Sequence, residues 1–374
     1  MTKTMKTQTT KPQSGLCAAV KTTADNRPKP GRNSGSRPAP GAGPSAAFAK
    51  WRQRNVAALD LTMSRLLKKL ARGQGPEISA LIEAMVYCLL SGGKRLRPLL
   101  ALAAAEAVGG RARSAFPAAM AVEMIHCYSL IHDDLPAMDD DDLRRGRPTC
   151  HKVYGEGRAI LAGDALLTLA FEVIFSGADD SEALRRSQAA LYLARSAGVL
   201  GMVGGQVLDL AFETGSESLE SVAPQPGRDA GKSSPPRRSI APAGSKEISE
   251  AMVRDMETRK TGGLISAALA CGAILGGASS AQVKTLSKMG LSLGLAFQIQ
   301  DDLLNLHGDV KLLGKAVGSD QKRGKATLPG IGGEEAAAAL LSKLTRECLT
   351  GAAGFGRSGQ NLVNLIESLV HRQS

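Results

Sequence analysis

Two aspartate-rich clusters carry the most recognisable chemistry in the chain. The first runs Asp133-Asp134-Leu-Pro-Ala-Met-Asp139-Asp140-Asp141-Asp142, and the second, Asp301-Asp302-Leu-Leu-Asn305, begins 168 positions later. Each cluster directly follows an apolar stretch that is typical of a buried helix. An ionised carboxylate buried without a partner is strongly unfavourable, so both clusters require cations. Because the ligands are all oxygens, the expected ions are hard ones such as Mg²⁺.

The spacing in the first cluster leaves two geometries open. Asp133 and Asp139 are six residues apart, with Pro136 between them. If the proline distorts or ends the helix, Asp139 turns back toward Asp133, whereas in a straight helix Asp140 is better aligned. The second cluster is regular, because Asp301 and Asn305 are one helical turn apart. A solvated acidic run is the alternative, but two clusters at the ends of apolar helices favour a metal site.

Basic residues accompany both clusters. Ser91-Gly92-Gly93-Lys94-Arg95-Leu96-Arg97-Pro98 places glycines and cations at the start of a Leu/Ala-rich helix, where free backbone N–H groups favour anions. A pair of arginines follows the first cluster closely enough to hold the same anion. The further cations are Lys260, Lys315 and Lys325. Metals and cations from both halves of the chain indicate a substrate system with more than one diphosphate.

The composition favours helices throughout. Hydrophobic residues make up 43% of the chain and aromatic residues only 3%. No proline lies between Pro148 and Pro224, an interval with long Ala/Leu-rich segments at 159–175 and 181–212. We therefore expect an all-α fold of roughly ten or more helices around a central cavity. The uncharged stretch 262–281 is rich in Gly, Ala and Ser, which favours a buried helix over a membrane span.

The formal charge of +12 is unevenly distributed. Residues 1–45 hold eight Lys/Arg against one Asp, together with six prolines, and residues 214–246 hold five basic and three acidic residues. We interpret 1–45 as a disordered basic arm, 214–246 as a flexible insertion and the rest of 46–374 as one domain. A nucleic-acid-binding face on the folded part is not indicated.

The cysteines and the basic arm indicate the cellular compartment of the protein. The six cysteines form no Cys-x-x-Cys pair, which indicates a reducing compartment rather than a disulfide framework or a zinc site. The arm has no apolar core typical of a secretory signal. We expect a cytoplasmic protein, with organelle import through residues 1–45 as the lesser alternative, because the proline density argues against an amphipathic transit helix.

Four ordered motifs resemble the trans-polyprenyl diphosphate synthase family, and most of all its bacterial farnesyl diphosphate synthases. They are Gly-Gly-Lys-Arg-x-Arg-Pro from Gly92, the long run from Ser129 through both arginines to His151, Lys260-Thr261-Gly, and Phe297-Gln298-Ile-Gln-Asp-Asp. The resemblance covers nearly all of residues 46–374. It implies the isoprenoid synthase fold, a homodimer, and Mg²⁺-dependent head-to-tail condensation of dimethylallyl or geranyl diphosphate with isopentenyl diphosphate.

The resemblance also implies residue roles. Three Mg²⁺ would be held by Asp133, Asp134, Asp139 and Asp301, with support from Asp302 and Asn305. The allylic diphosphate would be bound by Arg144, Lys260, Thr261, Gln298 and Lys315, and Lys325 is a further candidate for substrate binding. Isopentenyl diphosphate would be bound by Gly93, Lys94, Arg97, His126 and Arg145. Asn305 departs from the family pattern, in which a third aspartate is common.

Product length is predicted from the helix before Asp133. Tyr128, with its neighbour Ser129, lies about 7 Å deeper along that helix, a depth suited to the floor of a hydrocarbon pocket. In the family that the motifs resemble, a large aromatic residue there, together with the Leu135-Pro136 insertion, goes with a fifteen-carbon product, and ordinary core packing is the alternative role. A geranylgeranyl diphosphate synthase would share every catalytic residue. A terpene cyclase is less favoured, because the isopentenyl motif is present, and a nucleic-acid-binding adaptor using the arm is the remaining alternative.

Overall fold

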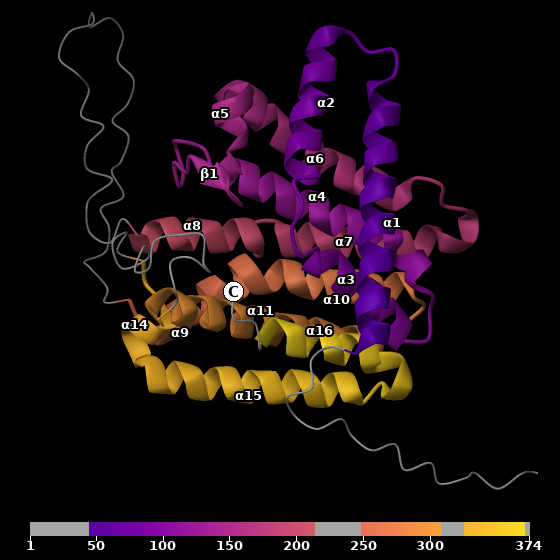
Figure 1. Cartoon of the computed structure of the whole chain (residues 1–374). Helices are drawn as coiled ribbons and strands as arrows, with labels where there is room; N and C mark the ends of the chain where they lie inside the picture. Colours follow the sequence, from indigo (N-terminus) through magenta and orange to yellow (C-terminus); the bar gives the residue numbers. More distant parts are fainter. Residues whose placement is uncertain (1–44, 214–247, 308–324, 371–374) are drawn as a thin grey trace, which may run out of the picture. The chain divides into compact units, whose positions relative to one another are not determined.

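A computed structural model describes the chain at residues 45–213, 248–307 and 325–370, and it consists almost entirely of helices (Figure 1). In the first range the helices are α1 (Ala46–Ala71), α2 (Pro76–Leu89), α3 (Leu96–Ala107), α4 (Phe116–Asp133), α5 (Cys150–Tyr154), α6 (Glu156–Phe175), α7 (Asp180–Ala197) and α8 (Met202–Glu213). The later ranges contain α9 (Glu250–Glu257), α10 (Gly263–Leu275), α11 (Ser280–His307), α14 (Leu328–Gly332), α15 (Glu334–Ala353) and α16 (Gln360–Val370). Short helical turns are η1 (Ala112–Ala115), η2 (Thr258–Gly262) and η3 (Gly356–Gly359).

Several of the helices begin where the local sequence satisfies their free N–H groups. Ser45, Asp179 and Ser249 are N-caps whose side chains accept hydrogen bonds from the first turns of α1, α7 and α9. Proline occupies the first turn of α2 and α4, where its missing N–H costs nothing. The all-α prediction is therefore confirmed, with helix starts that follow from ordinary capping chemistry.

Helix α10 forms the centre of the fold, and every one of its residues is buried. It packs against α3, α4, α7 and α11 (Figure 1). Small side chains make this possible: a Cβ atom added to Gly272 would overlap the backbone of Ala101 on α3. The Ala/Gly-rich composition thus serves close helix packing, and the expected burial of the 262–281 stretch is found along α10.

Two local features differ from the sequence-based expectation. The segment 181–212 is two helices, because the chain turns at Gly198–Gly201, where a Cβ atom on Gly201 would overlap the Ser196 carbonyl. A two-stranded hairpin, β1 (Leu143–Arg144) paired with β2 (Arg147–Pro148), follows the first aspartate cluster. Its strands are too short to show an alternating pattern.

Two described segments are apolar and long enough to cross a membrane by length and composition alone. In residues 112–133, 67% of the most apolar window is buried inside the protein, which identifies a core helix. In residues 180–212 only 28% is buried, and the segment is divided between α7 and α8. The predicted arm, apart from Ser45, and the whole predicted insertion lie outside the described residues.

Candidate active site

The first aspartate cluster lies at the end of α4, where the chain turns back on itself. The helix ends at Asp133, and the Asp139 backbone N–H donates to the Asp133 carbonyl at 2.8 Å. Asp140 instead has a left-handed backbone (φ 49°), an exposed side chain and a backbone bond to Leu135 at 3.1 Å. Of the two geometries left open by the sequence, the structure has the turned one, which places Asp139 beside Asp133.

Ionisation of the Asp133 carboxyl is unfavourable in the metal-free protein. Burial raises the pKa of Asp133 to about 6, and the carboxylates of Asp139 and Asp134 add to the effect. The nearby Lys260 ammonium and Arg144 guanidinium oppose this rise in pKa without cancelling it. A divalent cation placed among these oxygens would relieve the repulsion.

Asp134 is more buried than Asp133 and already has a cationic partner. Its side chain is 5% exposed, and its Oδ1 accepts from Arg144 Nε at 2.8 Å and also from the terminal Arg144 nitrogen. Arg144 lies 3.3 Å from Asp141 as well, so it holds both ends of the acidic turn together. Burial still raises the pKa of Asp134, since desolvation outweighs the arginine.

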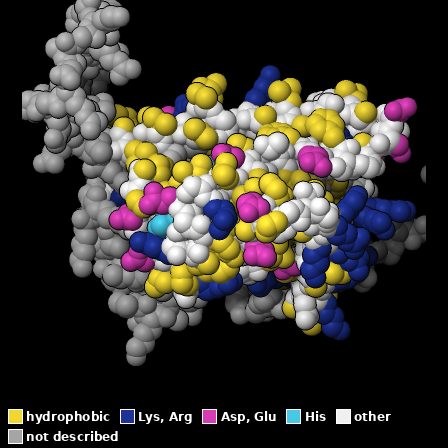
Figure 2. Space-filling view, turned by 90° about the horizontal axis from the view of Figure 1, so that it is seen from above, with side chains coloured by type: hydrophobic (Ala, Val, Ile, Leu, Met, Phe, Trp, Pro, Cys, Tyr) yellow, Lys and Arg dark blue, Asp and Glu magenta, His cyan; other side chains and the backbone are white. Residues whose placement is uncertain are grey.

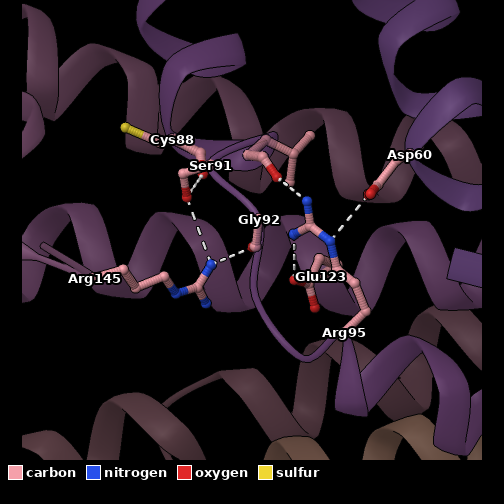
Figure 3. A network of polar contacts seen from close by, with 8 residues as sticks. Asp60, Cys88, Ser91, Gly92, Arg95, Glu123 and Arg145 are labelled. Atoms are coloured by element: carbon pink, nitrogen blue, oxygen red, sulfur yellow. Dashed lines mark hydrogen bonds and ion pairs between the residues drawn. The ribbon is translucent and has the colours of Figure 1, made fainter. Parts of the chain in front are cut away.

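The β1–β2 hairpin directs its two arginines to different places. Its turn needs positive φ at Arg145 (56°) and Gly146 (73°), which rotates the two guanidinium groups apart. Arg144 contacts the aspartates, whereas Arg145 donates to the carbonyl of Gly92 and lies 3.5 Å from Ser91 Oγ (Figure 3). The hairpin therefore connects the carboxylate cluster to the glycine-rich loop before α3.

Arg95 holds the glycine-rich loop in place. The Arg95 guanidinium is buried and donates to Asp60 at 3.0 Å, Glu123 at 2.7 Å and the Leu89 carbonyl at 2.7 Å (Figure 3). Each of its three guanidinium nitrogens donates within the protein, so we interpret Arg95 as a structural cation. Lys94 and Arg97 line the cavity beside it, together with Arg95 itself.

A cavity of about 620 Å³ opens next to this loop. It contains all five residues predicted to bind isopentenyl diphosphate, and it is also lined by Phe297 of α11. Burial lowers the pKa of Arg97 to about 10, with Glu123 opposing and Arg145 adding to the effect. Burial, followed by Arg97 and Arg145, holds the pKa of His126 well below its usual range, so this imidazole is neutral in a cationic pocket. The pocket has the electrostatics of an anion site.

The second aspartate cluster belongs to a chain of hydrogen bonds between η2 and α11. Thr261 Oγ1 donates to Gln298 Oε1 at 3.2 Å, and Gln298 Nε2 donates to Asp302 Oδ1 at 2.9 Å. Asp302 also shares a hydrogen bond with Glu257, whose pKa is raised to about 10 by burial and then by Asp302. Glu257 is thus protonated at neutral pH. Asp301 and Asn305 lie half-buried on the same helix.

Lys260 lies on the π-helical turn η2, close to the carboxylates of Asp209 and Asp133. Its Nζ pairs with Asp209 on α8, and Lys325 lies 4.0 Å from the same oxygen. Together with Glu257, Thr261 and Asp302 they line a second, smaller cavity of about 90 Å³. Lys260 also opposes the rise in the Asp133 pKa more strongly than Arg144 does, so η2 joins the two aspartate clusters. The predicted ligand Lys315 lies outside the described residues.

Asp209 and Glu257 were not predicted from the sequence. Asp209 lies within an Ala/Leu-rich segment. Glu257, three positions before Lys260, belongs to no recognisable acidic cluster. Their function depends on partners 51 and 45 residues away, at Lys260 and Asp302, and no local spacing indicates such pairs.

The two residues predicted to set product length have different surroundings. Tyr128 is 7% exposed on α4 and makes an edge-on contact with the His132 ring at 5.7 Å. Ser129 Oγ donates to the His126 carbonyl of its own helix at 3.0 Å. Tyr128 fills space below the aspartates, whereas Ser129 is turned to the backbone.

The donor set fits magnesium better than a preformed protein cage. Among the described residues, no three His, Cys, Asp or Glu side chains converge closely enough to hold a metal ion by themselves. Mg²⁺ normally uses one or two carboxylates and completes its shell with phosphate oxygens and water. Asp133 and Asp139, adjacent and mutually repelling, supply that kind of half-site.

The all-α fold, with carboxylates beside cation-lined cavities, agrees with the class of enzyme that the comparisons show, the prenyltransferases. The polyprenyl synthetase family model matches residues 78–352, and the chain belongs to that family.

Individual relatives differ in product. The chain is 41% identical over 278 residues to the farnesyl diphosphate synthase of Geobacillus stearothermophilus, covering 73% of this chain and 80% of that one. It is 42% identical over 273 residues to the heterodimeric geranylgeranyl pyrophosphate synthase large subunit 2 of Arabidopsis thaliana, covering 73% of this chain and 65% of the relative. The solved FPP/GFPP synthase of Zymomonas mobilis superposes with a TM-score of 0.69 at 32% identity, covering 86% of this chain and all of that one.

Proposed function

We propose that the protein condenses an allylic diphosphate with isopentenyl diphosphate and releases farnesyl diphosphate and pyrophosphate. The observation that carries this proposal is the pairing of two different anion sites. The 620 Å³ cavity is lined by Lys94, Arg97 and Arg145, and the hairpin that supplies Arg145 also places Arg144 on the metal-binding aspartates. Two diphosphates would thus be held side by side.

In this reaction the acidic residues would bind metal ions, and the basic residues would bind the diphosphates. Asp133, Asp139 and Asp301 are the proposed principal ligands of Mg²⁺, with Asp134, Asp302 and Asn305 in support. When bound, Mg²⁺ would supply positive charge to the leaving diphosphate. Lys260 and Arg144 lie close enough to Asp133 to act on the same anion. Neutral His126 would orient the second substrate by hydrogen bonding, since it carries no charge there.

The product assigned here is the fifteen-carbon farnesyl diphosphate. Buried Tyr128 supports it, because a bulky ring below the aspartates limits the depth available to a growing chain. The test is incubation of purified protein with labelled isopentenyl diphosphate and geranyl diphosphate, with and without Mg²⁺, followed by chromatographic sizing. A Mg²⁺-dependent fifteen-carbon product supports the proposal, and absence of any condensation product contradicts it.

A twenty-carbon product is the second candidate. Several relatives are named geranylgeranyl pyrophosphate synthases, including that of Capsicum annuum at 40% identity over 293 residues. The same assay separates the two, because both activities would share the anion sites and differ only in the depth of the hydrocarbon pocket.

We further propose a homodimer and a cytoplasmic location. Large hydrophobic side chains are exposed on α7, α8 and the turn between them, among them Leu184, Val199, Leu200 and Val207. Hydrophobic side chains also reach the surface elsewhere, as the face in Figure 2 shows. Self-association would cover the α7–α8 surface, and sedimentation measures it directly. The names of chloroplastic relatives keep organelle import as the lesser alternative.

A further inference from the structure

Three cysteines from three separate elements line one small cavity behind the hairpin. They are Cys88 on α2, Cys127 on α4 and Cys150 at the start of α5. The cavity measures about 50 Å³ and is also lined by Arg144 and Arg145. The condensation proposed above needs no thiol, so these groups are left without a role by it.

Cys88 and Cys150 are direct neighbours. Interaction between the two thiols raises the pKa of Cys88 and lowers that of Cys150. Independent contacts bring the same two segments together: Tyr87 Oη donates to the Pro148 carbonyl at 2.8 Å, and the Tyr87 and Tyr154 rings meet edge-on at 5.6 Å. Two thiols from segments that are docked on both sides are placed for a disulfide.

The cavity selects the oxidant by size. A volume of about 50 Å³ holds only a few water-sized molecules, so hydrogen peroxide fits and the tripeptide glutathione does not. The two thiols also differ in reactivity, since the thiolate is the nucleophile and Cys150 is the one whose pKa is lowered.

We propose that Cys88 and Cys150 form a peroxide-driven disulfide that regulates the isopentenyl diphosphate site; this regulation rests on the function proposed above. The Cys150 thiolate attacks one peroxide oxygen, so that an S–O bond forms, the O–O bond breaks and water leaves after protonation. Cys88 then attacks the Cys150 sulfur, so that the S–S bond forms and the S–O bond breaks with loss of a second water. Both thiol protons leave in the two waters, the dithiol is oxidised by two electrons, and the peroxide is reduced.

The disulfide would change substrate binding by shifting the loop before α3 relative to the β1–β2 hairpin. A disulfide brings its sulfurs closer than a hydrogen bond does, and Cys88 lies just before the Ser91–Gly93 loop that receives Arg145 (Figure 3). Cys150 lies just after the hairpin that carries Arg145. Shortening this connection displaces Arg145 relative to Gly93, so binding of isopentenyl diphosphate weakens while the Asp133 side of the site changes less.

The experiment treats the full-length protein with hydrogen peroxide and maps disulfides by mass spectrometry of a non-reducing digest. We expect a Cys88–Cys150 linkage that disappears with dithiothreitol, in the wild type and in Cys127→Ser. Cys271→Ser is the matched control, because that thiol is buried in α10 and donates to the Ala189 carbonyl, away from the cavity. Cys88→Ser and Cys150→Ser should each abolish the linkage. A Cys88–Cys127 bridge, or no bridge, would overturn the proposal.

Kinetics complete the test. Oxidation of the wild type should raise the KM for isopentenyl diphosphate several-fold, with a smaller change for the allylic substrate, and reduction should reverse it. The increase should be absent in Cys150→Ser, and its persistence there would contradict regulation by this pair. The linkage is measured without any activity, so failure of the proposed condensation and failure of the thiol pair give different results.

Discussion

Asp133 shows at the residue scale why the site should bind metal in a pH-dependent way. Its folded-state pKa of about 6 lies above the ordinary 3.8, so the metal-free protein holds this proton more tightly than the unfolded chain. The group therefore costs stability as pH rises from about 4 to about 6, and the cost stays constant above that. Metal binding has the opposite dependence, because it requires the ionised form.

We predict that the affinity for Mg²⁺ falls about fourfold between pH 7.5 and pH 5.5 through this group, since about a quarter of it is ionised at the lower pH. Isothermal titration with Mg²⁺ measures it. Asp133→Asn should bind Mg²⁺ more weakly and lose this part of the pH dependence. An Asn variant with the wild-type profile would show that another group controls the affinity.

Glu257 offers a second test, because its proton is structural. With a pKa raised to about 10, it donates to Asp302 at neutral pH, and glutamine can replace it as a donor. Glu257→Gln should keep near-wild-type stability, whereas Glu257→Ala should lose about 1–3 kcal/mol of unfolding free energy. Urea denaturation is the measurement. Glu250→Ala, an exposed residue of the same helix paired with Arg254, is the control and should change little. Equal losses in the Gln and Ala variants would contradict the protonated state.

Tyr128 is the residue on which product length should depend. Tyr128→Ala removes the ring that packs on His132 below the aspartates, so the main product should shift from fifteen to longer carbon chains. Tyr128→Phe retains the volume and should retain the product. Chromatography of the dephosphorylated products measures both. An unchanged profile in the alanine variant would leave Tyr128 with a packing role only.

At the scale of elements, the loop before α3 and the β1–β2 hairpin work as one unit. Gly92 and Gly93 both have positive φ, at 86° and 113°, so any side chain strains either position. Only Gly93 faces a neighbour: a Cβ atom there would lie 2.6 Å from Arg145, whereas Gly92 faces open space. The pair therefore separates backbone strain from displacement of the arginine.

We predict that Gly93→Ala raises the KM for isopentenyl diphosphate more than Gly92→Ala does, with similar small losses of stability in both. Steady-state kinetics with each substrate varied in turn, together with thermal unfolding, provide the comparison. If both variants raise the KM equally, the effect comes from the loop backbone, which includes the Gly92 carbonyl that accepts from Arg145, and not from a clash at Gly93.

The helices were predictable from the sequence, because hydrophobic periodicity and the positions of proline and glycine are local signals. The turn that returns Asp139 to Asp133 was one of two geometries, and only the folded backbone selects it. Asp209 and Glu257 were missed because the role of a carboxyl in a helix cannot be inferred until its partner, distant in the sequence, is known. The short hairpin was missed because two residues per strand carry no period.

At the scale of the whole molecule, the site is assembled around the buried helix α10. The elements that pack on it carry the loop at the start of α3, the aspartates that end α4 and those on α11. The π-helical turn η2 runs directly into α10 and carries Lys260 between the two clusters. Close packing of small residues at the centre therefore fixes the distance between the two aspartate clusters.

The limit of the folded unit can be tested by truncation. The predicted boundary was residue 45, yet Ser45 is the N-cap of α1, and its hydroxyl accepts from the Phe48 N–H at 3.2 Å. Removing residues 1–43 keeps this cap, whereas removing residues 1–45 deletes it and should cost about 1 kcal/mol of unfolding free energy. Both truncated proteins should retain the kcat/KM of the full chain, because the described catalytic residues all follow α1. Denaturant unfolding and steady-state kinetics, with Ser45→Ala in the full-length chain as the matched control, measure the two effects separately. Loss of activity on removing residues 1–43 would show that the basic arm takes part in catalysis.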